Sequence, residues 1–188
     1  MRKLSVFNSI SIDGYFTDKN SDMSWAHNPQ PDEEFDEFVV ANAGGGGVLL
    51  FGRKTYDLMA SFWPTPQAQQ TMPEVAVGMN RMTKYVFSKS LNKVSWENSY
   101  LIKGDLLEEV QKIKSSPGPD IAILGSGSLV SQLTNAGLID EYQMVIIPLI
   151  LGSGRTQFEG LKNKLPLKLN KSKHFKNGNV FLSYSVPN

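Results

Sequence analysis

Two short stretches of this chain are apolar at almost every position and end at glycine. They read GVLLFG at 47–52 and DIAILG at 120–125, and a helix-like pattern follows each of them. A strand that is apolar on both faces must be covered on both faces, as in parallel sheets whose connecting helices lie on either side. The two stretches therefore predict central strands of a parallel sheet.

The same alternation of strand and helix patterns continues along the chain. Further strands are predicted at 3–10, 83–88, 99–104 and 140–148, and helices at 31–42, 53–62, 105–116 and 128–137. Near the end, 167–175 and 179–186 read as a hairpin whose two-residue turn is Asn177-Gly178. We expect an α/β three-layer sandwich, with a mostly parallel central sheet and a C-terminal antiparallel hairpin at its edge.

Length and composition favour one domain and exclude several functions. A chain of 188 residues, 40% of them hydrophobic, can bury one core, so we expect a single domain over 1–188. The net charge is +1 without a basic stripe, which argues against nucleic acid as a partner. The longest apolar run, 144–151, is too short to cross a bilayer. With no signal-peptide pattern, we expect a cytoplasmic protein that does not bind membranes.

Residue usage also limits the chemistry. The chain has no cysteine, which excludes disulfides, thiolate catalysis and cysteine-bound metals. Its two histidines, His27 and His174, are far apart in sequence, so we expect no metal site.

The turn Gly125-Ser126-Gly127 joins a predicted strand to a predicted helix. Glycine allows close approach of a ligand to the backbone, and a helix N-terminus offers free N–H groups and a positive dipole end to an anion. The usual dinucleotide fingerprint has a third glycine, but this chain has Val130 there. The turn alone is therefore equally compatible with a phosphate site and with a tight corner.

Two other strand ends carry residues suited to phosphate. Arg53 can grip a ribose 2′-phosphate with its planar guanidinium, and Thr55 can offer its hydroxyl and its backbone N–H. Ligands of open α/β sheets bind beyond the carboxyl ends of the strands, where all these residues are expected to lie. The residues concerned at the two ends are Gly52, Arg53, Lys54, Thr55, Ser88 and Lys89.

These pieces, in this order, resemble the dihydrofolate-reductase-like superfamily. Within it the chain is most similar to the reductase domain of bacterial riboflavin biosynthesis, the C-terminal domain of RibD, and to its stand-alone relatives. The matching motifs cover nearly the whole chain. They are SIDGYF at 11–16, MSW at 23–25, LLFGRKTYDLM at 49–59, YVFSKSL at 85–91, AILGSGSLVSQL at 122–133 and GLIDEYQMVIIPLILGSGRTQFEG at 137–160.

The resemblance implies an NADPH-dependent reductase. The implied substrate is a small heterocycle, pyrimidine- or pterin-like, or a carbonyl compound, as for 5-amino-6-(5-phosphoribosylamino)uracil reductase. The family often pairs through its sheet edge, so we also expect a homodimer. The implied cofactor-binding residues are the six named above together with Gly125, Ser126, Gly127, Ser128 and Leu129.

For the substrate and the proton we single out three residues. Asp13 matches the S-x-D-G segment of the family, and partial burial there would raise its pKa towards a useful value for proton transfer. It could also bind substrate, or only stabilise the turn with Gly14. Trp25 and Trp63 are expected in the substrate pocket, with core packing as the alternative. The loop with Arg155 could reach the substrate, but its sequence favours a simple strand-exit turn.

Three alternatives stay open. Reduction of folate or pterin would use a carboxylate on the first long helix, Asp32 or Glu34, although acidic residues in a first helical turn usually only complement the dipole. The second alternative is a non-catalytic NADP-binding module, and the third is a structural module without a ligand. No basic cluster that would bind a ribose 5-phosphate substrate is apparent in the sequence.

Overall fold

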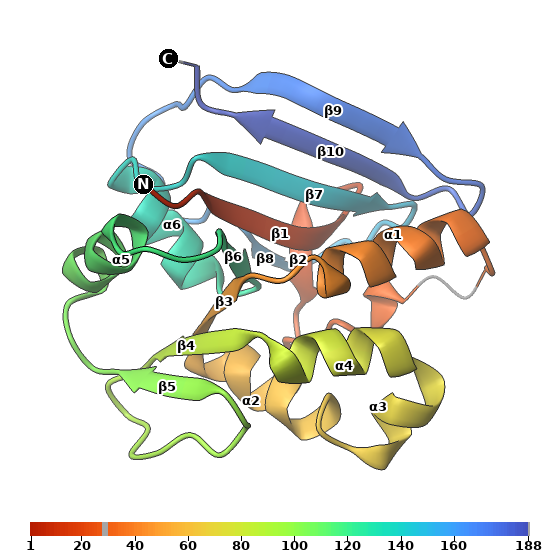
Figure 1. Cartoon of the computed structure of the whole chain (residues 1–188). Helices are drawn as coiled ribbons and strands as arrows, with labels where there is room; N and C mark the ends of the chain where they lie inside the picture. Colours follow the sequence, from red (N-terminus) through yellow and green to blue (C-terminus); the bar gives the residue numbers. More distant parts are fainter. Residues whose placement is uncertain (28–29, 188) are drawn as a thin grey trace.

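The structure is a computed structural model that describes residues 1–27 and 30–187 (Figure 1). Within these residues, eight strands form one sheet in the order β5-β4-β3-β6-β1-β7-β10-β9. Their bounds are β1 Leu4–Ser11, β3 Val48–Gly52, β4 Thr83–Phe87, β5 Ser99–Ile102, β6 Ile121–Leu124, β7 Glu141–Ile147, β9 Lys168–His174 and β10 Val180–Ser185. The first six strands in this order, from β5 through β7, run parallel to one another. Strands β10 and β9 follow at one edge of the sheet, and each is antiparallel to the strand before it.

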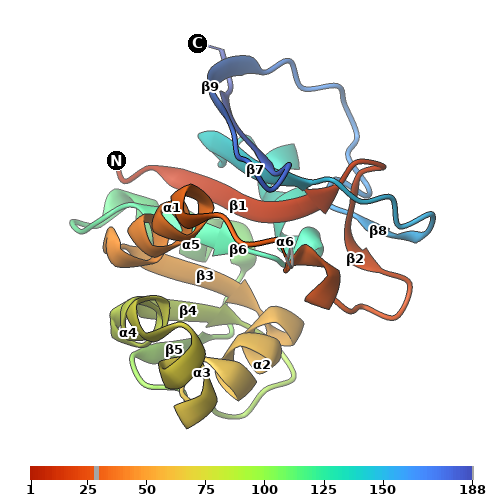
Figure 2. The same ribbon diagram turned by 90° about the vertical axis from the view of Figure 1, so that its right-hand side faces the viewer.

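Helices cover both faces of this sheet (Figures 1 and 2). Helices α5 and α6 pack on one face, and α1 and α4 on the other. The helices are α1 Glu33–Gly44, α2 Arg53–Phe62, α3 Pro66–Thr71, α4 Pro73–Arg81, α5 Leu106–Ser115 and α6 Gly127–Asn135. None of the helices in the described ranges is long and apolar enough to cross a membrane. The predicted three-layer α/β sandwich is confirmed.

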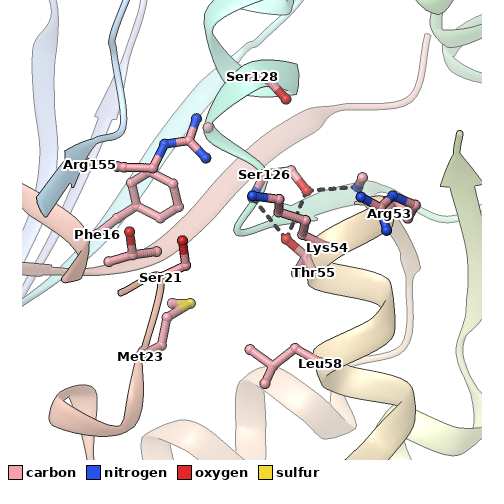
Figure 3. A pocket seen from close by; sticks show the side chains of 13 residues that line it. Phe16, Ser21, Met23, Arg53, Lys54, Thr55, Leu58, Ser126, Ser128 and Arg155 are labelled. Atoms are coloured by element: carbon pink, nitrogen blue, oxygen red, sulfur yellow. Dashed lines mark hydrogen bonds between the residues drawn. The ribbon is translucent and has the colours of Figure 1, made fainter. Parts of the chain in front are cut away.

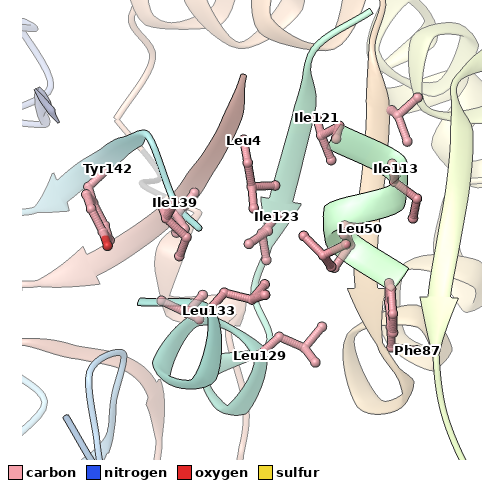
Figure 4. Packing of buried hydrophobic residues seen from close by; sticks show 14 residues of the cluster. Leu4, Leu50, Phe87, Ile113, Ile121, Ile123, Leu129, Leu133, Ile139 and Tyr142 are labelled. Carbon is pink, nitrogen blue, oxygen red and sulfur yellow. The ribbon is translucent and has the colours of Figure 1, made fainter. Parts of the chain in front are cut away.

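Strand β3 shows why the apolar runs had to be central. Val48 and Leu50 point into the core beneath α5 and α6, while Leu49 and Phe51 point into the core beneath α1 and α4. All four are at most 5% exposed, so every side chain of this run is covered. Figure 4 shows the first of these cores, where Leu50 lies among side chains from other strands of the sheet and from α5 and α6.

The sequence missed two parts of the fold. Helices α3 and α4 were not predicted, although both begin at a proline in a first-turn position. A second, two-stranded antiparallel sheet was also missed, made of β2 (Tyr15–Asp18) and β8 (Gly154–Thr156). This small sheet projects beyond the end of β1 and forms one wall of a cavity described below (Figure 2).

The predicted hairpin is present, but its turn lies one residue earlier than predicted. Gly178 N–H donates to the Phe175 carbonyl at 3.0 Å, so Lys176 and Asn177 are the central residues and Gly178 follows them with φ +86°. The positive φ that glycine supplies is needed after the tight turn rather than inside it.

Candidate functional site

The turn after β3 and the turn after β6 are joined by the side chains of Thr55 and Ser126 (Figure 3). The Ser126 hydroxyl accepts a hydrogen bond from Gly52 N–H at 2.7 Å, and Ser126 N–H donates to the Thr55 hydroxyl at 3.1 Å. The two hydroxyls lie 3.0 Å apart. Because β3 and β6 are neighbours in the sheet, these contacts fix the two turns as one unit.

The second turn is also tied to β1. The buried Asn8 side chain accepts from Gly125 N–H at 2.6 Å, and its amide lies 3.4 Å from the Gly125 carbonyl. Gly125 has φ +61°, and a Cβ there would lie 2.7 Å from the Thr55 hydroxyl oxygen. Both glycines of the turn are required by close packing, since a Cβ at Gly127 would meet the Phe16 ring at 2.9 Å. The tight-corner interpretation of this turn is therefore correct as far as packing goes.

The same turns also suit an anion. Helix α2 begins at Arg53 after Gly52, and helix α6 begins at Gly127 after Ser126, and no side chain caps either N-terminus. By contrast, Asp105 caps α5 through its side chain. The first N–H groups of an α-helix have no partner within the helix, so two uncapped ends side by side offer several donors and two positive dipole ends.

These two helix ends open into a cavity of about 260 Å³, which we call the basic cavity (Figure 3). Arg53, Lys54 and Arg155 supply its charges, and no carboxylate lines it among the described residues. Arg53 lies 3.6 Å from Asp57 on the same helix, in an exposed pair that leaves the guanidinium accessible. The lining residues are Phe16, Thr17, Ser21, Met23, Gly52, Arg53, Lys54, Thr55, Leu58, Ser126, Gly127, Ser128 and Arg155.

Most of the predicted cofactor-binding residues meet at this cavity. Four do not line it: Ser88, Lys89, Gly125 and Leu129. Ser88 follows β4, whose last residue pairs with Gly52, and its hydroxyl accepts from Leu91 N–H at 3.1 Å to close a turn. Lys89 is exposed beside it. Leu129 is buried in the core beneath α6, which places its side chain away from the cavity.

A second cavity, of about 920 Å³, lies between α1, the start of α4 and strands β1 and β7, and we call it the acidic cavity. Its apolar lining comes from the sheet, from α1, from Trp63 after α2 and from the first turn of α4. Glu33, Asp36, Glu37 and Glu74 supply its charges. The full lining is Phe7, Ser9, Ala26, His27, Gln30, Glu33, Phe35, Asp36, Glu37, Val39, Val40, Trp63, Thr71, Met72, Pro73, Glu74, Val75, Val145 and Asn177.

Asp13 lies in neither cavity. Its carboxylate accepts hydrogen bonds from the Ser11 hydroxyl at 2.7 Å and from the backbone N–H groups of Leu151 and Gly152 at 3.1 and 2.7 Å. The Ser11 hydrogen bond, helped by the two amides, lowers the pKa of the Asp13 carboxyl. The expected rise in its pKa is therefore wrong. The side chain ties the turn after β1 to the turn that leads into β8.

The two tryptophans predicted in the substrate pocket, Trp25 and Trp63, lie in different places. Trp63 lines the acidic cavity and donates its indole N–H to the Met59 sulfur at 3.1 Å. Trp25 packs against the apolar cluster around Val145 and Phe181 and donates its indole N–H to the Asp22 carbonyl at 3.1 Å. It is not among the residues that line either cavity.

The carboxylates of the folate alternative have structural partners. Asp32 is 7% exposed and caps α1, and its other oxygen accepts from Asn177 N–H in the hairpin turn at 3.0 Å. The hydrogen bond from Asn177 holds the pKa of Asp32 below its ordinary value. Glu34 forms a 2.9 Å ion pair with Lys173. Neither residue lines the basic or the acidic cavity, whereas their neighbours Glu33 and Asp36 line the acidic one.

Sequence reasoning undervalued Arg155 and missed Asn8. Arg155 stands on β8, which pairs with β2 and so brings the guanidinium to the basic cavity. Asn8 was unremarkable in a strand-like stretch. An amide at a position that should be apolar in a buried central strand was the available signal, because buried polar side chains need partners.

A family model for the RibD C-terminal domain matches residues 2–181. The chain belongs to the RibD C-terminal domain family. Two curated relatives of the chain come from Bacillus subtilis strain 168. The uncharacterized protein YyaP is 31% identical over 97% of this chain and 94% of its own length, and the uncharacterized protein YwjB is 25% identical over 93% and 92%.

Solved structures share the fold of this family member. A putative riboflavin biosynthesis protein from Shewanella sp. PV-4 superposes with a TM-score of 0.79 at 24% identity, over the full length of both chains. A diaminohydroxyphosphoribosylaminopyrimidine deaminase/5-amino-6-(5-phosphoribosylamino)uracil reductase from Thermotoga maritima gives a TM-score of 0.67 at 14% identity, over 99% of this chain and 57% of that one. The chain thus has a reductase-like fold.

Proposed function

We propose that this protein is an NADPH-dependent reductase of a small heterocyclic or carbonyl substrate. One observation carries the proposal: two uncapped helix N-termini and three cationic side chains converge on one cavity that no described carboxylate lines. Backbone N–H groups at helix ends bind phosphate, and arginine binds it through paired hydrogen bonds. A dinucleotide with a 2′-phosphate matches this combination.

The residues around the cavity suggest how the cofactor would be held. The N-terminal amides of α2 and α6 would bind the pyrophosphate, with Arg155 facing them from β8. Arg53 and Lys54, beside the end of β4, would bind the 2′-phosphate together with Lys89. NADPH supplies the hydride when bound, and the protein supplies its position.

The acidic cavity is the proposed substrate site. Ser9, on the last part of β1, lines the acidic cavity, and Phe16, on β2, lines the basic one, so the chain from the end of β1 to β2 runs from one cavity to the other. A nicotinamide ring beside this segment would face a substrate lying on Trp63. The use of Asp13 as the proton donor stays a prediction, and its position outside both cavities makes substitution the decisive test.

Names of structural relatives support the same reaction class. One relative from Corynebacterium diphtheriae is described as a pyrimidine reductase-like protein, and it superposes with a TM-score of 0.65. At 14% identity this likeness shows a shared fold, and the substrate of the present chain has to be found by experiment.

Titration with NADPH and, separately, NADH tests the proposal through tryptophan quenching. We expect NADPH to bind more tightly than NADH, and Arg53→Ala to weaken NADPH roughly tenfold, about 1.4 kcal/mol, with little change for NADH. Lys103→Ala, an exposed lysine outside the cavity, is the matched control and should change neither. Failure of both cofactors to bind would overturn the proposal.

The homodimer and the cytoplasmic location also stay proposals. Light scattering that gives twice the chain mass of 20.9 kDa would support the dimer, and the mass of one chain would overturn it.

A further inference from the structure

We propose that the substrate of the acidic cavity is an uncharged or cationic ring compound without a phosphate group. The inference rests on the proposed function, because it concerns the substrate of the same reductase. The site is given by the cavity itself, about 920 Å³ with an apolar floor, and the charges at its rim decide which ligands it accepts.

The floor suits a flat, apolar ring. Phe7 and Val145 on neighbouring strands, Val39 on α1 and Trp63 beyond α2 present apolar surface from three sides. Trp63 is half-buried, which leaves part of its indole free to contact a ligand. Aromatic surfaces of this kind stack on other rings at offset or edge-to-face geometry.

Four carboxylates lie at the rim, beside neutral polar residues and His27. Glu33, Asp36 and Glu37 come from the first turns of α1, and Glu74 from the first turn of α4. No lysine or arginine lines this cavity, and none of these four carboxylates forms an ion pair within the described chain. Uncompensated charges of one sign around a cleft raise the local concentration of the opposite charge and repel the same charge.

The neighbouring basic cavity makes the contrast specific. Arg53, Lys54 and Arg155 all line that cavity, where the proposed cofactor brings its own phosphates. A phosphate group on the substrate would therefore face the carboxylates of the acidic cavity, while the cations of the basic cavity would already bind the phosphates of the cofactor. On the α1 side, Lys173 already pairs with Glu34 and does not line the acidic cavity.

A series of probes with the same ring and different charge tests the inference. The probes are benzamidinium, benzamide, benzoate and phenyl phosphate, added to protein saturated with NADPH so that the basic cavity is filled. Binding is followed by NMR through the indole N–H signal of Trp63. We expect benzamidinium and benzamide to bind about tenfold or more tightly than benzoate at low salt, with phenyl phosphate weakest, and the ratio to shrink at high salt.

Charge reversal on the rim supplies the matched comparison. Glu37→Lys combined with Glu74→Lys should reverse or abolish the preference for the cation, whereas Glu108→Lys, an equally exposed position on α5, should leave it unchanged. All three positions are exposed, so the variants should fold.

The outcomes separate this inference from the proposed function. Tight NADPH binding with equal or better binding of benzoate, or with no binding of any ring, would overturn the charge selection alone. Failure of NADPH to bind would overturn the reductase. In that case the same probe series on the free protein would still support or overturn the charge selection.

Discussion

The basic and acidic cavities are built from different kinds of wall. Backbone turns form the first, and hydrogen bonds among Thr55, Ser126, Gly52 and Asn8 lock them in place. Side chains form most of the second, and α1 is its principal wall. None of the four large apolar residues of α1 is fully buried: Phe35, Phe38, Val39 and Val40.

Space beneath α1 explains this partial burial. A third cavity of about 310 Å³ lies between α1, α4 and the sheet, and it shares Phe7, Val39, Trp63 and Val75 with the acidic cavity. Helix α1 thus rests on a poorly filled layer, whereas α5 and α6 pack on a filled one. If both cavities bind ligands as proposed, the basic cavity is preorganised for a ligand of fixed shape, and the acidic cavity can adapt to its ligand.

Gly125→Ala should cause the largest loss of stability, because it disrupts the hydrogen-bonded turns after β3 and β6. The left-handed backbone costs an alanine about 1–2 kcal/mol, and the 2.7 Å contact with the Thr55 hydroxyl adds overpacking, for about 3 kcal/mol in all. Gly137→Ala is the matched control, since Gly137 has φ +66° with no atom within 4 Å of the added Cβ. Urea unfolding measures both variants. Equal losses of stability would show that the turn is not tightly packed.

A pair of valine substitutions compares the two helix layers. Val110 on α5 is 0% exposed, so Val110→Ala should lower the free energy of unfolding by about 2 kcal/mol through lost burial and a new cavity. Val39 on α1 borders two existing cavities, and Val39→Ala should cost less than about 1 kcal/mol. Comparable losses, measured by the same unfolding experiment, would contradict a loosely packed α1.

Asp13→Asn should have the smallest effect on stability. The substitution tests whether the rigid part of the molecule extends beyond the basic cavity to the turn after β1. The native pKa of Asp13 lies below the value in the unfolded chain, so its carboxylate stabilises the fold above about pH 4 and loses this contribution as the pH falls through the native pKa. Wild type and Asp13→Asn should therefore differ by a constant, small amount from pH 5 to 8 and converge in acid. Stability against pH, measured by thermal unfolding, checks this.

A carboxyl titration followed by NMR gives the matching control. Ser11→Ala removes the strongest donor to Asp13 and should return the pKa of its carboxyl towards the ordinary value. A titration of Asp13 above its ordinary range in the wild type would instead support its use as a general acid.

The sequence predicted the sheet because its central strands obey a local rule. In β3 and β6, apolar residues on both faces leave few alternatives to a covered parallel strand. Helix α3, with the sequence PQAQQT, has no apolar period, and its only buried residue is Ala68, so its formation depends on neighbours. Strands β2 and β8 have four and three residues and pair across more than 100 positions, which no local pattern shows.

For the site, residue types were more informative than roles. The glycines and cations at the strand ends could be found because backbone access and charge depend on residue identity alone. The lowered pKa of Asp13 could not, because two of the donors to its carboxylate are amides in a distant turn. Arg155 was undervalued for the same reason, since only the pairing of β8 with β2 brings it to the cavity.

The place of β1 in the sheet has a consequence for synthesis of the protein. Its two neighbours are β6 and β7, and Asn8 lies 117 residues before its partner Gly125. At roughly 5–20 residues per second, the ribosome needs on the order of ten seconds to make that partner. During this time β1 has no neighbour on either side, and its apolar side chains are available to chaperones or to other nascent chains.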